Sequence, residues 1–172
     1  MDILTREENM KLRNLVFAVC AMTVLAACVP PVDIPPEPTL DIALPVAGTE
    51  EIWQATDYQG KPVLVAVMAT WCPWCKKSLG ALDKTSQDFN EKVEVVGIFI
   101  DEDPALVAQV KKDYNIQSKI LYKGNEAAGT LEVQGFPHIV LFDQKHKVVK
   151  VWNGYAEDLA DQYAAEINKL LK

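Results

Sequence analysis

The stretch VLVAVMATWCPWCKKSLG, residues 63–80, decides the fold that the sequence predicts. Its first six residues form a continuous apolar run rich in valine, which is typical of a central strand covered on both faces. A helix is expected from Pro73 to about Phe89, because proline is favoured at the first helical position and Leu79, Leu82 and Phe89 can form an inner face. A strand that leads through two cysteines directly into a helix indicates an α/β domain.

The two cysteines of this stretch, Cys72 and Cys75, have the spacing of a redox pair. Residues three apart share one face of a helix, so their sulfurs can meet at disulfide distance. The N–H groups and the dipole at a helix N-terminus favour a thiolate, so we expect Cys72 to be the exposed nucleophile. Cys75, one turn further on, is expected to be more buried and to resolve a mixed disulfide. Trp71, Pro73 and Trp74 should surround the pair, and the two indoles can offer a substrate a flat apolar contact.

A metal site and an inert bridge are the alternatives for this cysteine pair. A closed zinc site needs four ligands, and beyond residue 28 the chain offers Cys72, Cys75, His138 and His146 with no second C-x-x-C motif. A bridge between residues three apart closes almost no loop and adds little stability. We therefore expect a redox-active Cys72–Cys75 disulfide, with no metal and no other cofactor.

A second motif, GFPHIVLFD at residues 135–143, places a proline at the start of an expected strand. Proline is uncommon inside a sheet because it lacks the N–H that the ladder needs. A cis Phe136–Pro137 bond would mark a tight turn, and the Phe136 backbone could then pair with an extended substrate chain. An ordinary edge-strand proline is the alternative on this motif alone. Phe136, Pro137 and His138 are thus candidate substrate-binding residues.

The remaining sequence continues the alternation of strands and helices. The expected elements are a strand at 93–100, a helix capped by Asp103 with Pro104 at its first position, a short helix within 125–133, strands at 138–143 and 147–152 separated by a polar turn, and a C-terminal helix at 156–171 with Leu159, Tyr163, Ile167 and Leu170 on one face. This order predicts an α/β domain over residues 49–172, with three α/β/α layers and a mixed central sheet.

The charge of the chain limits its partners. The 172 residues carry a formal net charge of −7, with a sequence pI of about 4.8. A general nucleic-acid binder needs a basic face to neutralise phosphates, so we expect no nucleic-acid partner. We expect a monomer.

The N-terminal residues 1–27 have the pattern of a signal peptide. Lys11 and Arg13 precede an apolar stretch at 15–27, and Met10 is a possible true start. This stretch is shorter than the roughly 20 residues that span a bilayer, and it has the length of a signal-peptide core. An export signal implies a compartment in which disulfides persist.

The end of this segment, LAAC at residues 25–28, resembles the bacterial lipobox, in which the cysteine carries a lipid. The alternative is an ordinary signal peptide that contains a cysteine. Six of the ten prolines follow within residues 29–45, so we expect residues 28–48 to be a lipidated Cys28 and an extended tether outside the core. The protein would then be exported to the cell envelope, anchored to a membrane and facing the periplasm or the outside.

The sequence from about residue 50 to 172 resembles the thioredoxin fold and, within it, the membrane-anchored TlpA-like thiol–disulfide oxidoreductases. The resemblance is carried by ATWCPWCKK, the strand before it, VVGIFIDEDP and GFPHIVLFD. It implies a thioredoxin fold, a cis-Pro137 that faces the Cys72–Cys75 pair, and exchange with the thiols and disulfides of protein substrates. It also implies a reductant that a membrane thiol donor keeps reduced.

Three positions depart from this family pattern. The buried Asp of thioredoxin is replaced by Ala66, and the Glu that several TlpA-like proteins carry after the second cysteine is replaced by Ser78. Water or another carboxylate, such as Asp101, is then left to accept the Cys75 proton. His138 follows the candidate cis-proline, where threonine is frequent. It is either a base that tunes the thiolate or a strand-end histidine without a chemical role.

The direction of electron flow stays open at the level of sequence. A disulfide oxidase or isomerase, a metal- or haem-delivery module using the same cysteines, and a catalytically silent interaction domain are the alternatives to a reductant. The helix terminus stabilises the Cys72 thiolate, which favours the reduced form and therefore an oxidising protein. The resemblance alone favours the reductant.

Overall fold

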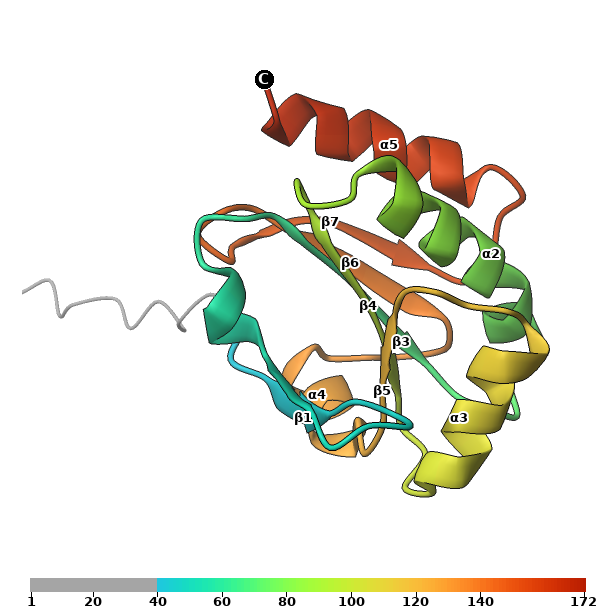
Figure 1. The fold of residues 1–172 in the computed structure, drawn as a ribbon. Helices are drawn as coiled ribbons and strands as arrows, with labels where there is room; N and C mark the ends of the chain where they lie inside the picture. Colours follow the sequence, from blue (N-terminus) through green and yellow to red (C-terminus); the bar gives the residue numbers. More distant parts are fainter. Residues whose placement is uncertain (1–39) are drawn as a thin grey trace, which may run out of the picture. The chain divides into compact units, whose positions relative to one another are not determined.

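A five-stranded sheet forms the centre of the computed structural model, which describes residues 40–172 (Figure 1). The strand order is β5-β4-β3-β6-β7. The strands are β3 (Val63–Met68), β4 (Glu94–Phe99), β5 (Lys119–Leu121), β6 (His138–Phe142) and β7 (Val148–Asn153). Strand β4 runs parallel to β3 and β5, whereas β6 runs antiparallel to β3 and β7. The predicted mixed sheet is confirmed, and β5 is a short strand that the sequence analysis missed.

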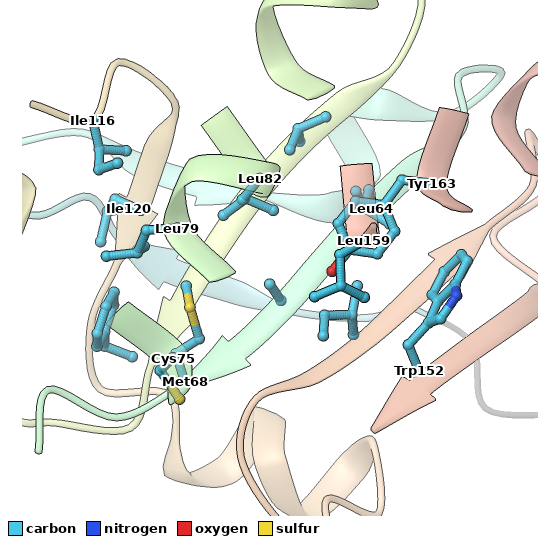
Figure 2. Packing of buried hydrophobic residues seen from close by; sticks show 14 of the residues in the cluster. Leu64, Met68, Cys75, Leu79, Leu82, Ile116, Ile120, Trp152, Leu159 and Tyr163 are labelled. Atoms are coloured by element: carbon cyan, nitrogen blue, oxygen red, sulfur yellow. The ribbon is translucent and has the colours of Figure 1, made fainter. Parts of the chain in front are cut away.

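Helices cover both faces of this sheet, as predicted (Figure 1). The buried apolar residues of α2 (Pro73–Asp88), α3 (Pro104–Asp113) and α5 (Leu159–Leu170) belong to one cluster, which Figure 2 shows around Leu64 and Met68. The other face packs against α4 (Asn125–Thr130), the 3-10 helix η1 (Ala55–Tyr58) and a hairpin of β1 (Ala43–Pro45) and β2 (Ile52–Gln54). The domain is therefore a three-layer α/β/α sandwich.

The central strand β3 supplies both layers of the core. All six of its residues are buried, as expected for an apolar run without polar alternation. Leu64, Ala66 and Met68 join the cluster under α2 and α5, and the three valines that alternate with them join the opposite cluster. The chain then enters α2 at Pro73, so the cysteine motif lies at the end of the best-buried strand.

The expected cap of α3 and the expected inner face of α5 agree with the structure, although α5 begins at Leu159 and not at residue 156. The Asp103 carboxylate caps α3 by accepting the Ala105 N–H at 2.9 Å, with Pro104 at the first helical position. In α5, Leu159, Tyr163 and Ile167 are buried against the sheet, and Tyr163 contacts Trp152 edge-to-face. Both predictions depended on local chemistry, namely the cap and the 3.6-residue period.

The segment just before residue 49 is core and not tether, which corrects the prediction for residues 40–48. Leu40, Ile42, Leu44 and Val46 are buried in the cluster under the hairpin, and Ala43–Pro45 pairs with β2. Trp53 of β2 is 1% exposed and its indole N–H donates to Glu94 at 2.9 Å. The hairpin thus covers a sheet face that would otherwise expose valines to water.

The remaining N-terminal predictions fall on residues 1–39. The signal peptide, the lipidated Cys28 and the first part of the tether lie outside the described residues. Within residues 40–172, no helix has the length and apolar character needed to cross a membrane.

Candidate active site

Cys72 lies at the N-terminus of α2, as the sequence predicts. It is the N-cap residue, and its sulfur accepts a hydrogen bond from the Cys75 N–H at 3.2 Å. The Cys72 S–H points to the Phe136 carbonyl oxygen at 3.7 Å. Both cysteines are free thiols in the structure. A backbone N–H and the positive end of the helix dipole therefore meet at the Cys72 sulfur.

Cys72 is more buried than expected. Its exposed fraction is 4%, against 0% for Cys75, and both belong to the cluster that includes Met68. Figure 2 shows Cys75 and Met68 at one end of that cluster. The expectation of an exposed Cys72 was wrong, because the capping geometry turns its sulfur inward, to the Cys75 N–H and the Phe136 carbonyl. A substrate sulfur that reacts with Cys72 therefore has to lie on an accessible segment of the substrate chain.

Cys75 is a weak acid in this setting. Burial raises the pKa of its thiol to about 12, and the hydrogen bond with Cys72 adds to the rise. Neither of the two positions that depart from the family pattern supplies a carboxylate: Ala66 is a buried core residue, and the Ser78 hydroxyl donates to the Cys75 carbonyl at 2.8 Å. Cys75 therefore keeps its proton at neutral pH.

The Asp101 carboxylate holds the loop that leads into the cysteine pair. Its Oδ2 accepts the Thr70 N–H at 2.9 Å, and its Oδ1 accepts the Thr70 hydroxyl at 2.6 Å. The Cys72 N–H closes the same loop by donating to the Ala69 carbonyl at 3.1 Å. Asp101, the candidate acceptor for the Cys75 proton, thus directs one oxygen to the Thr70 N–H and the other to the Thr70 hydroxyl.

Replacing Asp101 should destabilise the protein measurably. Asp101→Asn leaves one acceptor oxygen for two donors, so we expect the free energy of unfolding to fall by about 1–2 kcal/mol, measured by urea titration. Asp103→Asn is the matched control, since it removes the same charge from an exposed cap that asparagine fills equally well. An Asp101→Asn variant as stable as this control would show that the clamp on Thr70 contributes nothing.

The Phe136–Pro137 segment lies beside Cys72, although 64 residues separate Phe136 from it in the sequence. The Phe136–Pro137 peptide bond is cis, and the Pro137 carbonyl accepts the Gly154 N–H at 2.8 Å. Within residues 40–172, no partner takes the Phe136 N–H. The structure thus brings Phe136 and Pro137 to the cysteine pair with one backbone donor unoccupied.

His138 lies on the other side of β6. Ile139 and Leu141 face the cluster that contains the cysteines, whereas Val140 and Phe142 face the opposite cluster. His138 alternates with Ile139, and it lines a cavity of about 360 Å³ with Val140 and other residues on that opposite side. Its Nδ1 is hydrogen-bonded to the Asn153 side-chain oxygen at 2.7 Å. This placement fits a strand-end histidine and does not bring the imidazole to the thiols.

Two exposed tryptophans flank the buried thiol. The side chain of Trp71 is 67% exposed and meets Phe136 edge-to-face, with ring centroids 5.8 Å apart. Trp74 is 52% exposed and stacks on Tyr155 at 6.0 Å. Both indoles are at the surface, where they can contact a partner, as the sequence predicts.

The sequence analysis missed Thr70, Lys77 and Tyr155. The Lys77 ammonium lies 4.5 Å from the Trp74 ring centroid and 5.8 Å from that of Tyr155. Lys77 lies two residues after Cys75, and Tyr155 follows the turn at Gly154, which has a φ of +81°. Neither position carries a local signal that joins it to the cysteines.

Metal-binding side chains do not gather in the described part of the chain. Over residues 40–172, no group of three or more His, Cys, Asp or Glu side chains is placed to hold a metal ion.

The fold and the thiol pair define the class of this protein: it is a thioredoxin-fold thiol–disulfide oxidoreductase, similar to the TlpA-like proteins. The Redoxin family model matches residues 38–167, so the chain belongs to the Redoxin family. The match includes the cysteine motif, the Phe136–Pro137 segment and the hairpin.

Named relatives agree with this class. The chain is 37% identical over 82 residues to a thioredoxin-like protein of Synechocystis, which covers 48% of this chain and 74% of that protein. It is 33% identical over 120 residues to the thiol:disulfide interchange protein DsbE of Pseudomonas aeruginosa, covering 62% of each. It is 30% identical over 96 residues to the thiol–disulfide oxidoreductase ResA of Bacillus cereus, covering 55% of this chain and 56% of ResA.

A solved structure shares the fold. The crystal structure of a putative DsbE from Chlorobium tepidum superposes with a TM-score of 0.72 at 18% identity, covering 79% of this chain and 97% of that one. At this identity, the likeness concerns the fold alone.

Proposed function

We propose that this protein is a membrane-anchored reductant of protein disulfides, with Cys72 as the nucleophile and Cys75 as the resolving thiol. The observation that carries the assignment of roles is the Cys75 N–H hydrogen bond to the Cys72 sulfur at the start of α2. That N–H favours negative charge on Cys72, whereas burial keeps the Cys75 proton in place. The direction of electron flow is proposed from the TlpA-like resemblance.

The proposed reaction has two steps. The Cys72 thiolate attacks one sulfur of a substrate disulfide, which forms a Cys72–substrate disulfide and releases the other substrate sulfur as a thiolate. Cys75 then loses its proton and attacks the Cys72 sulfur, which forms the Cys72–Cys75 disulfide and releases the reduced substrate. The released substrate sulfurs take up the two protons. The protein ends oxidised and needs a thiol donor to return to its reduced state.

The anchor and the location belong to the same proposal. A lipid on Cys28 of the LAAC motif would hold the domain at a membrane of the cell envelope. The described domain begins its buried core at Leu40, so residues 29–39 would connect it to the anchor. Labelling the expressed protein with radioactive palmitate tests this directly, with Cys28→Ala as the control that must lose the label.

The reduction potential tests the direction of electron flow. The full-length chain is equilibrated with glutathione or dithiothreitol buffers while the fluorescence of Trp71 and Trp74 is followed. We expect a value near or below about −230 mV, as for a thiol pair that gives electrons to substrates. A value between about −180 and −120 mV would instead make the protein a disulfide donor or isomerase. If the cysteine pair never equilibrates with the buffers and metal is retained after purification, the function would be metal delivery and not thiol–disulfide exchange.

A further inference from the structure

Beside the Cys72 thiol, the stacked rings of Trp74 and Tyr155 contact the positive charge of Lys77, which no carboxylate of the described domain neutralises. The Lys77 ammonium lies over the rings of Trp74 and Tyr155, which themselves stack. Over residues 40–172, no carboxylate forms an ion pair with Lys77. Lys84, two turns further along the same helix, does pair with a carboxylate, that of Asp88. The chain as a whole carries a net charge of −7, opposite in sign to the charge at this position.

The rings fix where this cation sits. A cation over an aromatic face is attracted by the ring even at an exposed site, which limits the rotamers that Lys77 adopts. Trp74 lies between the two cysteines, so the charge of Lys77 lies about one helical turn after Trp74 and two residues after Cys75. On the other flank, Trp71 and Phe136 form an aromatic contact without a cation. The two flanks of the thiol therefore differ in charge.

From this arrangement we propose that the site prefers substrates whose reacting cysteine lies in an extended segment with an acidic residue close by. The inference rests on the proposed function and names the class of its substrate. The indole of Trp74 offers apolar contact, and Lys77 offers the charge that an Asp or Glu side chain complements. Because Cys72 is buried, the substrate cysteine has to enter on an accessible segment, whose neighbouring residues then meet the flanks.

The test compares peptides that differ in one charge. Nine-residue peptides carry a central cysteine as a mixed disulfide with 2-mercaptoethanol, and Glu, Gln or Lys stands two residues before or after it. The rate constant for release of the peptide thiol by the reduced full-length chain is divided by that for bis(2-hydroxyethyl) disulfide, a neutral reference. We expect the Glu peptide to react about two- to fivefold faster than the Gln peptide, and the Lys peptide more slowly, as for one exposed charge pair. The difference should shrink at 0.5 M salt.

Variants of the cation separate this preference from general reactivity. Lys77→Met should remove the order Glu over Gln over Lys, and Lys77→Glu should reverse it. Lys84→Glu is the matched control, because it places the same change on the same helix, away from the aromatic pair, and should keep the order. If the reference disulfide is reduced but the three peptides react alike, or their order survives in Lys77→Glu, this inference is overturned. If the reference disulfide is not reduced at all, the proposed function itself fails.

Discussion

Cys72→Ala is expected to reduce thiol–disulfide exchange to the uncatalysed rate, whereas Cys75→Ala should trap substrates as mixed disulfides. Cys72 is the N-cap residue of α2 and the proposed nucleophile, so its loss removes the attacking group. Without Cys75 the attack by Cys72 still occurs, but no neighbouring thiol releases the product. Non-reducing gel electrophoresis after reaction with a disulfide-bonded protein measures both results.

The control for this experiment is the double variant Cys72→Ala, Cys75→Ala. The full-length chain also contains Cys20 and Cys28, and the double variant measures whatever these contribute. If mixed disulfides accumulate in Cys72→Ala and are absent from Cys75→Ala, the roles of the two cysteines are the reverse of those proposed. That outcome would mean that the buried Cys75 sulfur can still attack the substrate disulfide.

The active-site pair was predictable because its signal is local. Strand β3, the proline after Cys72 and the helical period of α2 lie within one continuous stretch, and each element follows from its own residues. The Phe136–Pro137 segment was also predictable as a motif, since proline at a strand entry is unusual. Only the family resemblance, however, related this segment to the cysteines.

The hairpin at the start of the domain was missed although its pattern is present. Leu40, Ile42, Leu44 and Val46 alternate with other residues at the period of a strand. The prolines up to Pro45 outweighed this period in the prediction, because proline-rich segments are usually extended linkers. An edge strand tolerates proline, and Pro45 is the last residue of β1, where it lies opposite Ile52 of β2 and its carbonyl accepts the Tyr122 N–H at 3.2 Å.

The contacts that shape the site could not be predicted from local patterns. The carboxylate of Asp101 reaches Thr70 across 31 residues, and Tyr155 meets Trp74 from the turn after β7. The inward turn of Cys72 likewise depends on the carbonyl of Phe136. Such pairs form only when the sheet brings distant loops to the same edge.

The resolving step is expected to speed up about tenfold for each pH unit from pH 7 to pH 10, or about a hundredfold between pH 7 and pH 9. Burial is the main cause of the raised pKa of Cys75, about 12, so only a minute fraction of this thiol is ionised at neutral pH. Because the group is an acid whose pKa is raised, its thiolate fraction keeps rising until the pH approaches 12. An ordinary cysteine, with a pKa of about 8.5, would level off above pH 9.

The measurement starts from the mixed disulfide between Cys72 and 2-mercaptoethanol and follows release of 2-mercaptoethanol by quenched sampling. The same disulfide in Cys75→Ala provides the background, since it lacks the internal thiol. A rate that levels off near pH 9 would show that Cys75 loses its proton as easily as a free cysteine. A group near the pair would then be accepting that proton, in spite of Ala66, Ser78 and the engaged oxygens of Asp101. A rate that rises steadily to pH 10 would mean that desolvation of the buried thiol limits release of the substrate.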